Sequence, residues 1–459
     1  MKPHDELKFD GIEKMKIKKL GSATILIETS DTKILCDPWL IDGAYYGAWC
    51  NFPPINLDDC DFSDVDYVYV SHVHPDHFDP NTIALLDKST PILIHKYHQK
   101  FLKFNIERLG FKAIELENGK PTQLLGNTKI SIYAADDCDP SICGHMFGCV
   151  TSEIKGSMQL DSLCIIDDGK HILVNTNDCP FGIAQKTLAR IKDDYPKIDF
   201  ALIGYTSASL YPHSMLDYSD KQMKKGIETA KMKGLLTGLD TLKILKPEHY
   251  LPFAGTYILG GSNYLKNKYL PIPELQDAVD FFQLELGKAD VNISPVLLNF
   301  NEFFDLQTRE QSARYTPINI KDRDKYINEI ASSFMYDYEV DEIPKKDELL
   351  NLFSDALERL AKKQKELNLF EDMNLLFDLQ NDEFACINLK DTTLTTINDI
   401  SIINNYHRFQ LDARLLKRVL RGPRFANWNN IEIGALLNFA RKPNEYRMDI
   451  HTLINALHI

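Results

Sequence analysis

The chain has 459 residues, of which 44% are hydrophobic and 26% charged, and its formal net charge is −14. This length predicts two or three domains rather than one core, and the composition excludes a disordered, collagen-like or coiled-coil protein. The negative charge disfavours a nucleic-acid partner. No run approaches the roughly 20 apolar residues of a membrane span. Because the first residues also lack the apolar core of a secretory signal, a cytoplasmic protein is expected.

The first fifty residues predict strands followed by an aromatic loop. The segments Lys16–Ile27 and Lys33–Cys36 suit two strands, and Thr29-Ser30-Asp31 between them supplies turn chemistry. A loop rich in Tyr, Trp and Pro then follows through Pro54. We expect this loop to form one wall of a pocket.

Strands and helices alternate from there to about residue 300. The β-branched and aromatic run Asp66–Val70 predicts a buried strand that stops abruptly at Ser71. Helices are predicted over Asn81–Asp87 and His98–Leu109. Further strands are predicted at Pro91–Ile94, Lys129–Tyr133, Leu163–Ile166, His171–Val174 and Phe200–Ile203.

The pattern changes after Phe300, which predicts a domain boundary there. Residues 1–300 are expected to form the catalytic domain and residues 301–370 a helical connector, in which Lys345–Leu369 predicts one long amphipathic helix. Residues 371–459 return to mixed strand and helix patterns and predict a C-terminal α/β domain.

Four metal-binding side chains fall within six residues, in the run His72-Val73-His74-Pro75-Asp76-His77. Because side chains alternate along an extended chain, His72 and His74 at a strand end point to the same side and can bind one ion. Asp76 and His77 follow on the turn and can hold a second ion. A surface His-rich turn is the alternative, but spacing and strand context would then have to coincide by chance.

This run resembles the HxHxDH signature of the metallo-β-lactamase superfamily, and Asp37 and the expected strands precede it. The resemblance implies an α+β fold, an αββα sandwich, that binds two divalent metal ions. It places the first two histidines of the run on one ion and the aspartate and last histidine on the other. It also implies a later bridging carboxylate after a strand, a turn and a strand, and Asp178 stands in that place.

The remaining two ligands of the family pattern have no clear counterpart. For the third motif, Asp137 and His145 are equal candidates. At the place of the final histidine stand Phe253 and Ala254, and the nearby His249 is a substitute that a structural role explains more simply. Fewer nitrogen ligands favour iron or manganese over zinc, and zinc stays an alternative.

Further segments resemble the metallo-β-lactamase part of CMP-N-acetylneuraminate hydroxylases over about residues 15–300. They include Cys36–Leu40, Asn175–Cys179 and Tyr205–His213. Those hydroxylases also carry a Rieske iron–sulfur domain, whose paired Cys and His ligands have no counterpart in this sequence.

The C-terminal segments Asp412–Gly422, Asn427–Gly434 and Arg441–Pro443 resemble sterol-carrier-like domains. The alternative is an ordinary α/β cap that forms a homodimer interface or closes the active site.

Three functions are compatible with these residues. In a hydrolase, two cations generate hydroxide from water near neutral pH, and Asp76 orients this nucleophile. The hydroxide attacks an ester, phosphodiester or amide bond of a small-molecule substrate, which could be nucleotide-sugar or lipid-like. In an oxygenase, a di-iron form of the site activates oxygen with electrons from a separate electron-transfer partner. A scaffold that binds ligand without chemistry is the third. Tyr205, Tyr211 and His213 follow a strand and are candidates to contact the substrate, with packing as the alternative.

Overall fold

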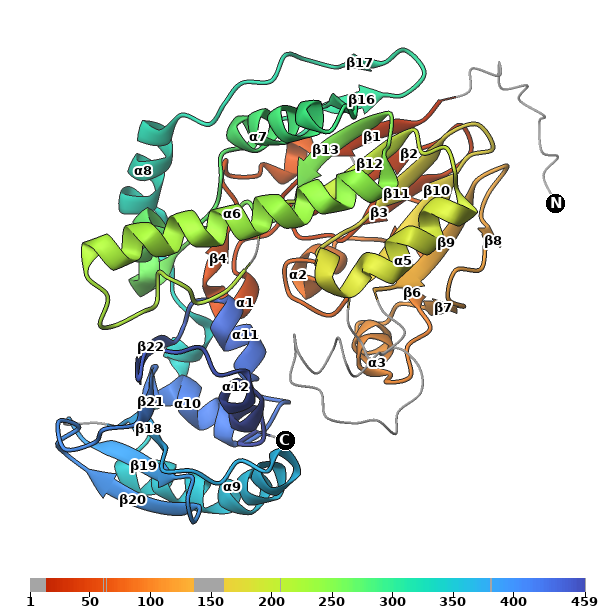
Figure 1. Ribbon diagram of the computed structural model, residues 1–459. Helices are drawn as coiled ribbons and strands as arrows, with labels where there is room; N and C mark the ends of the chain where they lie inside the picture. The colour runs from red at the N-terminus through yellow and green to blue at the C-terminus, as the bar shows by residue number, and fades with distance from the viewer. Residues whose placement is uncertain are drawn as a thin grey trace.

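The computed structural model describes residues 14–458 except 61, 63, 136–160, 207 and 380–381. In these ranges the chain forms a large N-terminal β-sandwich and a smaller C-terminal α/β domain (Figure 1). No helix within the described ranges is long and apolar enough to cross a membrane.

The first sheet of the sandwich has eight strands in the order β17-β16-β1-β2-β3-β5-β6-β7. They are β1 (Lys16–Lys19), β2 (Ile25–Glu28), β3 (Lys33–Cys36), β5 (Tyr67–Tyr69), β6 (Ile92–His95), β7 (Ala113–Leu116), β16 (Phe303–Asp305) and β17 (Glu310–Gln311). The segment predicted as one strand from Lys16 to Ile27 forms two, because the backbone turns back where Leu20 N donates to Thr24 O.

The second sheet has seven strands in the order β15-β13-β12-β11-β10-β9-β8. They are β8 (Thr122–Gln123), β9 (Lys129–Ala134), β10 (Ser162–Asp167), β11 (Ile172–Asn175), β12 (Phe200–Gly204), β13 (His249–Phe253) and β15 (Ser294–Pro295). A two-stranded sheet pairs β4 (Trp49–Cys50) with β14 (Ile258–Leu259).

Helices cover the outer faces of both sheets (Figure 1). These are α2 (Pro80–Ile83) and α3 (Phe101–Arg108) on the first sheet, and α5 (Phe181–Asp194), α6 (Asp220–Leu245) and α7 (Leu275–Lys288) on the second. Alternation along β2 sends Ile25 and Ile27 into the core between the sheets and Leu26 to the helical side. The predicted αββα sandwich is therefore confirmed.

The sandwich reaches further along the chain than the boundary predicted near residue 300. Both β16 and β17 lie after that point, and β16 pairs with β1 to extend the first sheet. The connector then contains α8 (Ile320–Glu329) and the long helix α9 (Lys346–Leu367), close to its predicted bounds.

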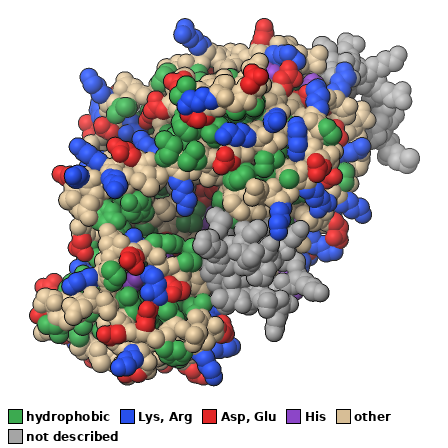
Figure 2. Space-filling model, viewed as in Figure 1, with side chains coloured by type: hydrophobic (Ala, Val, Ile, Leu, Met, Phe, Trp, Pro, Cys, Tyr) green, Lys and Arg blue, Asp and Glu red, His purple; other side chains and the backbone are tan. Residues whose placement is uncertain are grey.

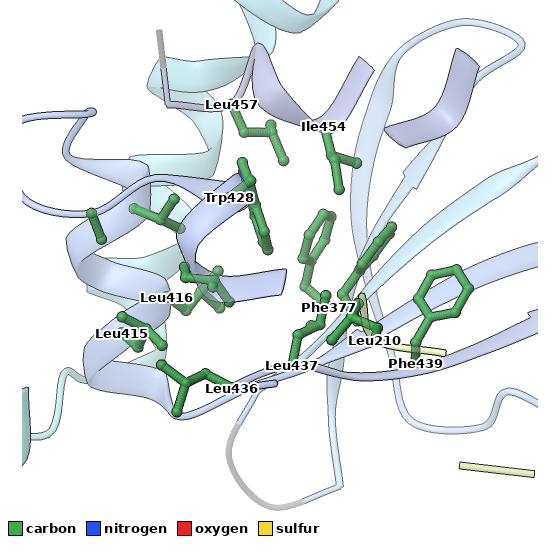
Figure 3. Close-up of a cluster of buried hydrophobic side chains, with 14 of the residues drawn as sticks. Leu210, Phe377, Leu415, Leu416, Trp428, Leu436, Leu437, Phe439, Ile454 and Leu457 are labelled. Carbon is green, nitrogen blue, oxygen red and sulfur yellow. The ribbon is translucent and has the colours of Figure 1, made fainter. Parts of the chain in front are cut away.

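The C-terminal domain packs helices against one five-stranded sheet. Its strands, in spatial order, are β20 (Thr393–Ile397), β19 (Phe384–Asn388), β18 (Asn374–Asp378), β21 (Tyr406–Gln410) and β22 (Asn438–Lys442), and its helices are α9, α10 (Ala413–Leu420), α11 (Trp428–Ile433) and α12 (Met448–Asn455). Figure 3 shows Trp428, Phe377 and Leu416 from different elements meeting in its core. The α/β character is as predicted, and the sterol-carrier likeness stays a prediction.

The two domains share backbone pairing and a hydrophobic cluster. Leu216 N donates to Phe439 O and Phe439 N donates to Ser214 O, so the loop before α6 pairs with β22. One continuous cluster of buried side chains contains Trp49 of the sandwich and Trp428 of α11. Figure 2 shows a hollow in the surface between the two domains, and charged side chains of both signs mixed over the visible face.

Candidate metal centre

The histidine run begins just after β5, at the carboxyl end of a buried strand, as predicted. His72 and His77 are buried, and Asp76 is 5% exposed. From the opposing sheet, β11 ends at Asn175 and delivers Asp178 to the same place. Among the described residues, His72, His77 and Asp178 form a group whose ligand atoms all lie within 4.8 Å of one another.

The first two histidines turn one nitrogen each toward the other. His72 Nε2 lies 2.8 Å from His74 Nδ1. Two nitrogens on one tetrahedral zinc ion would lie about 3.3 Å apart, so a small shift of these rings would accommodate a shared ion. The outward nitrogens have partners: His72 Nδ1 lies 2.8 Å from Asp161 Oδ1, and His74 Nε2 lies 2.6 Å from Asn429 Oδ1.

The third histidine of the run lies between three carboxylates. His77 Nδ1 is 2.9 Å from Asp37 Oδ2, and Asp37 also accepts hydrogen bonds from the backbone N–H and hydroxyl of Ser71. His77 Nε2 lies 3.2 Å from Asp178 Oδ2 and 3.5 Å from Asp76 Oδ2.

This arrangement fits a bound cation. With its Nδ1 proton donated to Asp37, the neutral ring would point the lone pair of Nε2 at two anionic oxygens, and Nε2 has no hydrogen-bond partner among the residues that the structure describes. A lone pair facing two carboxylates is repelled unless a positive charge lies between them, either a proton or a metal ion.

The pKa values report the same preference for positive charge. Burial acts to lower the pKa of His77, but Asp178, Asp76 and Asp37 outweigh it and hold that pKa well above its usual range. Burial likewise acts to raise the pKa of Asp178, and the histidines His77, His72 and His74 hold it well below the usual range. Asp178 therefore interacts with every histidine of the run.

Tyr45, from the aromatic loop, contacts this centre directly. Its hydroxyl donates to Asp76 Oδ1 at 2.5 Å, and its ring packs against Trp49. Burial, followed by the charge of Asp76, raises the pKa of Tyr45 well above its usual value, so the phenol stays a donor. Tyr45 and Tyr46 both have positive φ angles, 54° and 61°, and such backbone strain clusters at functional sites.

The other candidate ligands are not brought to this centre by the described part of the chain. Asp137 and His145 lie outside the described residues. His249 begins β13 and is aligned with Phe200 at the start of β12, whereas the run and Asp178 lie beyond the carboxyl ends of their strands. Phe253 is buried in the core between the sheets, so it occupies the place of the final histidine with an apolar ring.

The three candidate substrate contacts have different surroundings. Tyr205 is 1% exposed and packs in the core beneath α6 and α7, which fits the packing alternative. His213 is buried, and burial followed by the charge of Lys266 lowers its pKa to about 3. Tyr211 is partly buried beside Tyr218. A substrate contact by any of the three stays a prediction.

Three neighbours of the centre had no signal in the sequence pattern. Asp161 precedes β10 by one residue, and Tyr45 stands among several loop aromatics. Asn429 lies 355 residues from the histidine that it contacts. Chain topology alone brings these three side chains to the run.

The N-terminal domain matches a known family. Residues 16–189 match the family model described as the beta-lactamase superfamily domain. The match covers well under half of the chain and supports the predicted superfamily for the residues matched. The likeness to CMP-N-acetylneuraminate hydroxylases stays a prediction.

Two mycobacterial proteins are related to this chain over part of their length. A protein of Mycolicibacterium smegmatis, provisionally named a Rieske 2Fe-2S iron–sulfur protein, is 30% identical over 200 residues, which are 43% of this chain and 35% of that protein. A protein of the same description from Mycobacterium tuberculosis is 29% identical over 206 residues, covering 43% and 36%. The chain thus spans about a third of the length of the curated relatives it matches.

Solved structures show weaker similarity. Isothiocyanate hydrolase from Delia radicum gut bacteria is 16% identical with a TM-score of 0.42, covering 63% of this chain and 98% of that one. CmlA, a diiron β-hydroxylase from Streptomyces venezuelae, is 12% identical with a TM-score of 0.41, covering 64% and 54%.

Proposed function

We propose that this chain is a metal-dependent hydrolase with two divalent cations at the histidine run. The observation that carries the proposal is His77, which is buried and held through Nδ1 by Asp37. Its Nε2 faces the carboxylates of Asp76 and Asp178 and has no hydrogen-bond partner in the described part of the chain. A carboxylate that fixes the outer nitrogen of a histidine is the usual support of a metal ligand.

The ligands divide between two positions. His72 Nε2 and His74 Nδ1 would hold the first ion, because these atoms face each other. His77 Nε2 and Asp76 Oδ2 would hold the second ion. Asp178 would serve both positions, since its carboxylate lies within 4.8 Å of ligand atoms of His72, from the first position, and His77, from the second.

Two such cations would lower the pKa of a water between them toward neutrality and so supply hydroxide as a nucleophile. The chain's own residues then position the reaction. Asp76 has one oxygen toward His77 and the other held by the Tyr45 hydroxyl, so its carboxylate cannot rotate freely. The single O–H of the neutral Tyr45 phenol is used in that hydrogen bond, so Tyr45 acts by orienting Asp76. An ester, phosphodiester or amide of a small molecule is the proposed substrate class.

A di-iron oxygenase is the second candidate, and two observations favour it. The centre is rich in carboxylates, with Asp76, Asp161 and Asp178 all within 3.5 Å of histidine nitrogens, and oxygen ligands suit iron and manganese. The mycobacterial relatives are provisionally named as iron–sulfur proteins, a class that transfers electrons, and this candidate requires an electron-transfer partner.

Metal analysis of the full chain, purified without added metal, tests both candidates. We expect two bound divalent ions per chain in the wild type and fewer in Asp178→Asn and His72→Ala, with Asp79→Asn as the control. Stoichiometric zinc with hydrolysis of a nitrophenyl ester or phosphodiester supports the hydrolase. Iron with a visible absorption band and reductant-dependent oxygen consumption supports the oxygenase. Absence of bound metal after reconstitution with zinc, iron or manganese would overturn both.

A further inference from the structure

We propose that the C-terminal domain is part of the metal centre, because Asn429 of α11 is a positioning residue for His74. Its side-chain oxygen would hold the proton of His74 on Nε2 and leave the Nδ1 lone pair free for the first ion. This inference rests on the proposed function, since it assigns a role toward the metal bound there.

The contact has the geometry that this role requires. His74 Nε2 lies 2.6 Å from Asn429 Oδ1, and an amide oxygen can only accept, so the ring nitrogen must be the donor. The opposite nitrogen of the same ring faces His72 Nε2 at 2.8 Å. A neutral imidazole carries one N–H, so fixing the proton on the outer nitrogen turns the inner nitrogen into a ligand.

The residues next to Asn429 in the sequence fix the position of its helix. The neighbouring Trp428 is buried in the core of the C-terminal domain. Asn427 caps α11 by accepting a hydrogen bond from Asn430 N at 2.8 Å, and Asn427 N donates to the hydroxyl of Tyr46 at 3.0 Å. The backbone that carries Asn429 is therefore tied to the aromatic loop of the sandwich as well as to its own domain.

The far end of the same helix packs against Tyr45, the residue that holds Asp76. Gly434, which ends α11, lies so close to Tyr45 that an added Cβ would be 2.8 Å from the Cβ of Tyr45. Tyr45 in turn donates to Asp76. Figure 1 shows α11 directly beside α1, the short helical turn (Ala44–Gly47) that carries Tyr45. One helix of the C-terminal domain thus contacts His74 of the first proposed position and Tyr45, which holds Asp76 of the second.

A domain that merely docked beside the sandwich would not need these contacts. Other hydrogen bonds cross the same boundary without involving a histidine of the run, such as the one from Asn263 Nδ2 to Ala435 O at 3.0 Å. Asn263 therefore offers a matched control: it also links the domains through a side-chain amide, but it contacts no proposed ligand.

The experiment compares metal binding by the full-length chain and four variants. Asn429→Leu and Asn429→Ala remove the acceptor at two side-chain sizes, Asn429→Asp keeps an acceptor oxygen, and Asn263→Leu removes the control bond. Zn²⁺ affinity is measured by competition with a chromophoric chelator, and the visible spectrum of the Co²⁺-loaded protein reports on the ligand field.

We expect Asn429→Leu and Asn429→Ala to bind Zn²⁺ about 10- to 100-fold more weakly, as is typical for loss of a partner behind a ligand, and to shift the Co²⁺ spectrum. Asn429→Asp should rescue binding, and Asn263→Leu should bind as the wild type does. If Asn429→Ala keeps wild-type affinity and spectrum, or if Asn263→Leu loses as much affinity, the inference is wrong. A wild-type chain that binds no metal would instead overturn the proposed function, so the two failures are distinct.

Discussion

Asp37→Asn is a sharp test of how the second metal position is built. Asp37 is completely buried and accepts three hydrogen bonds, from Ser71 N at 2.7 Å, from Ser71 Oγ at 2.8 Å and from His77 Nδ1 at 2.9 Å. Asparagine has nearly the same shape but only one acceptor oxygen. Since Ser71 N can only donate, the amide oxygen must stay on that side, and the amide nitrogen then faces His77.

The consequence is a change in which ring nitrogens of His77 carry a proton. In the wild type the charges of Asp178, Asp76 and Asp37 outweigh burial and raise the pKa of His77 well above its usual range, so both nitrogens of the metal-free ring carry a proton. An amide N–H that points at Nδ1 requires a lone pair there, so the variant ring keeps only its Nε2 proton, which faces Asp76 and Asp178. That proton is well placed between two carboxylates, so the metal-free protein should lose only about 1 kcal/mol of unfolding free energy. A metal ion at Nε2 of the wild type leaves the Nδ1 proton beside Asp37, whereas in the variant it must displace the only proton of the ring. We expect the affinity of the second position to fall about 10- to 100-fold, or roughly 1.4 to 2.7 kcal/mol.

Two measurements separate these effects. Denaturant unfolding of chelator-treated protein gives the stability of the metal-free chain, and Zn²⁺ titration gives the affinity. Nitrogen NMR of the His77 ring identifies the protonated nitrogen. Asp79→Asn is the matched control, because Asp79 is also buried and both of its oxygens accept backbone hydrogen bonds, from Asn81 N and Thr82 N at the start of α2. This variant should also lose stability, but its Zn²⁺ affinity should stay at the wild-type value. Retention of both ions at wild-type affinity in Asp37→Asn would refute the reasoning.

Three further predictions concern other parts of the chain. Tyr45→Phe removes a hydrogen bond to a charged group, so the free energy of Zn²⁺ binding near Asp76 should weaken by about 1.5 to 3 kcal/mol; unchanged chelator competition would contradict this. Burial, opposed by the charge of Glu302, lowers the pKa of Lys19 to about 8, so the unfolded chain binds more protons between pH 8 and 10.5. The unfolding free energy attributable to Lys19 should therefore rise with pH in that window, by up to about 1.4 kcal/mol per unit, and Lys19→Met should lack this slope in parallel denaturant titrations. Trp428→Ala should cost about 3 to 5 kcal/mol in the same assay because its indole is fully buried, and a loss under 1 kcal/mol would show that the shared core is not formed.

Part of the proposed centre could be predicted from the sequence because four of its candidate ligands are local. His72, His74, Asp76 and His77 follow a single strand end, β5, where strand period places the first two on one side. Asp178 follows β11, more than a hundred residues later, and the family resemblance was needed to propose it.

The outline of the domain was harder to predict for the opposite reason. The boundary near residue 300 followed a change in composition, yet β16 and β17 return to the first sheet and pair beside β1. Pairing between strands almost 300 residues apart leaves no mark on the local pattern of a three-residue strand. In Lys16–Ile27 the turn at Gly21 was missed, because a single Gly-Ser pair between two short strand patterns is a weak turn signal.

Of the groups behind the proposed ligands, only Asp37 was part of the family resemblance, and Asp161 and Asn429 follow from neither local period nor motif. Asp37, Asp161 and Asn429 each lie against the outer nitrogen of one histidine, and they come from a strand end, a strand start and a helix of the other domain. An inner ligand must match the geometry of an ion, which restricts its residue type and spacing, whereas an outer partner needs only an acceptor oxygen at hydrogen-bond distance. Any surface that the fold places there can supply one. A second domain can therefore become part of a metal centre without carrying any metal-binding pattern of its own, and contacts such as the one between Asn429 and His74 must be sought in the structure.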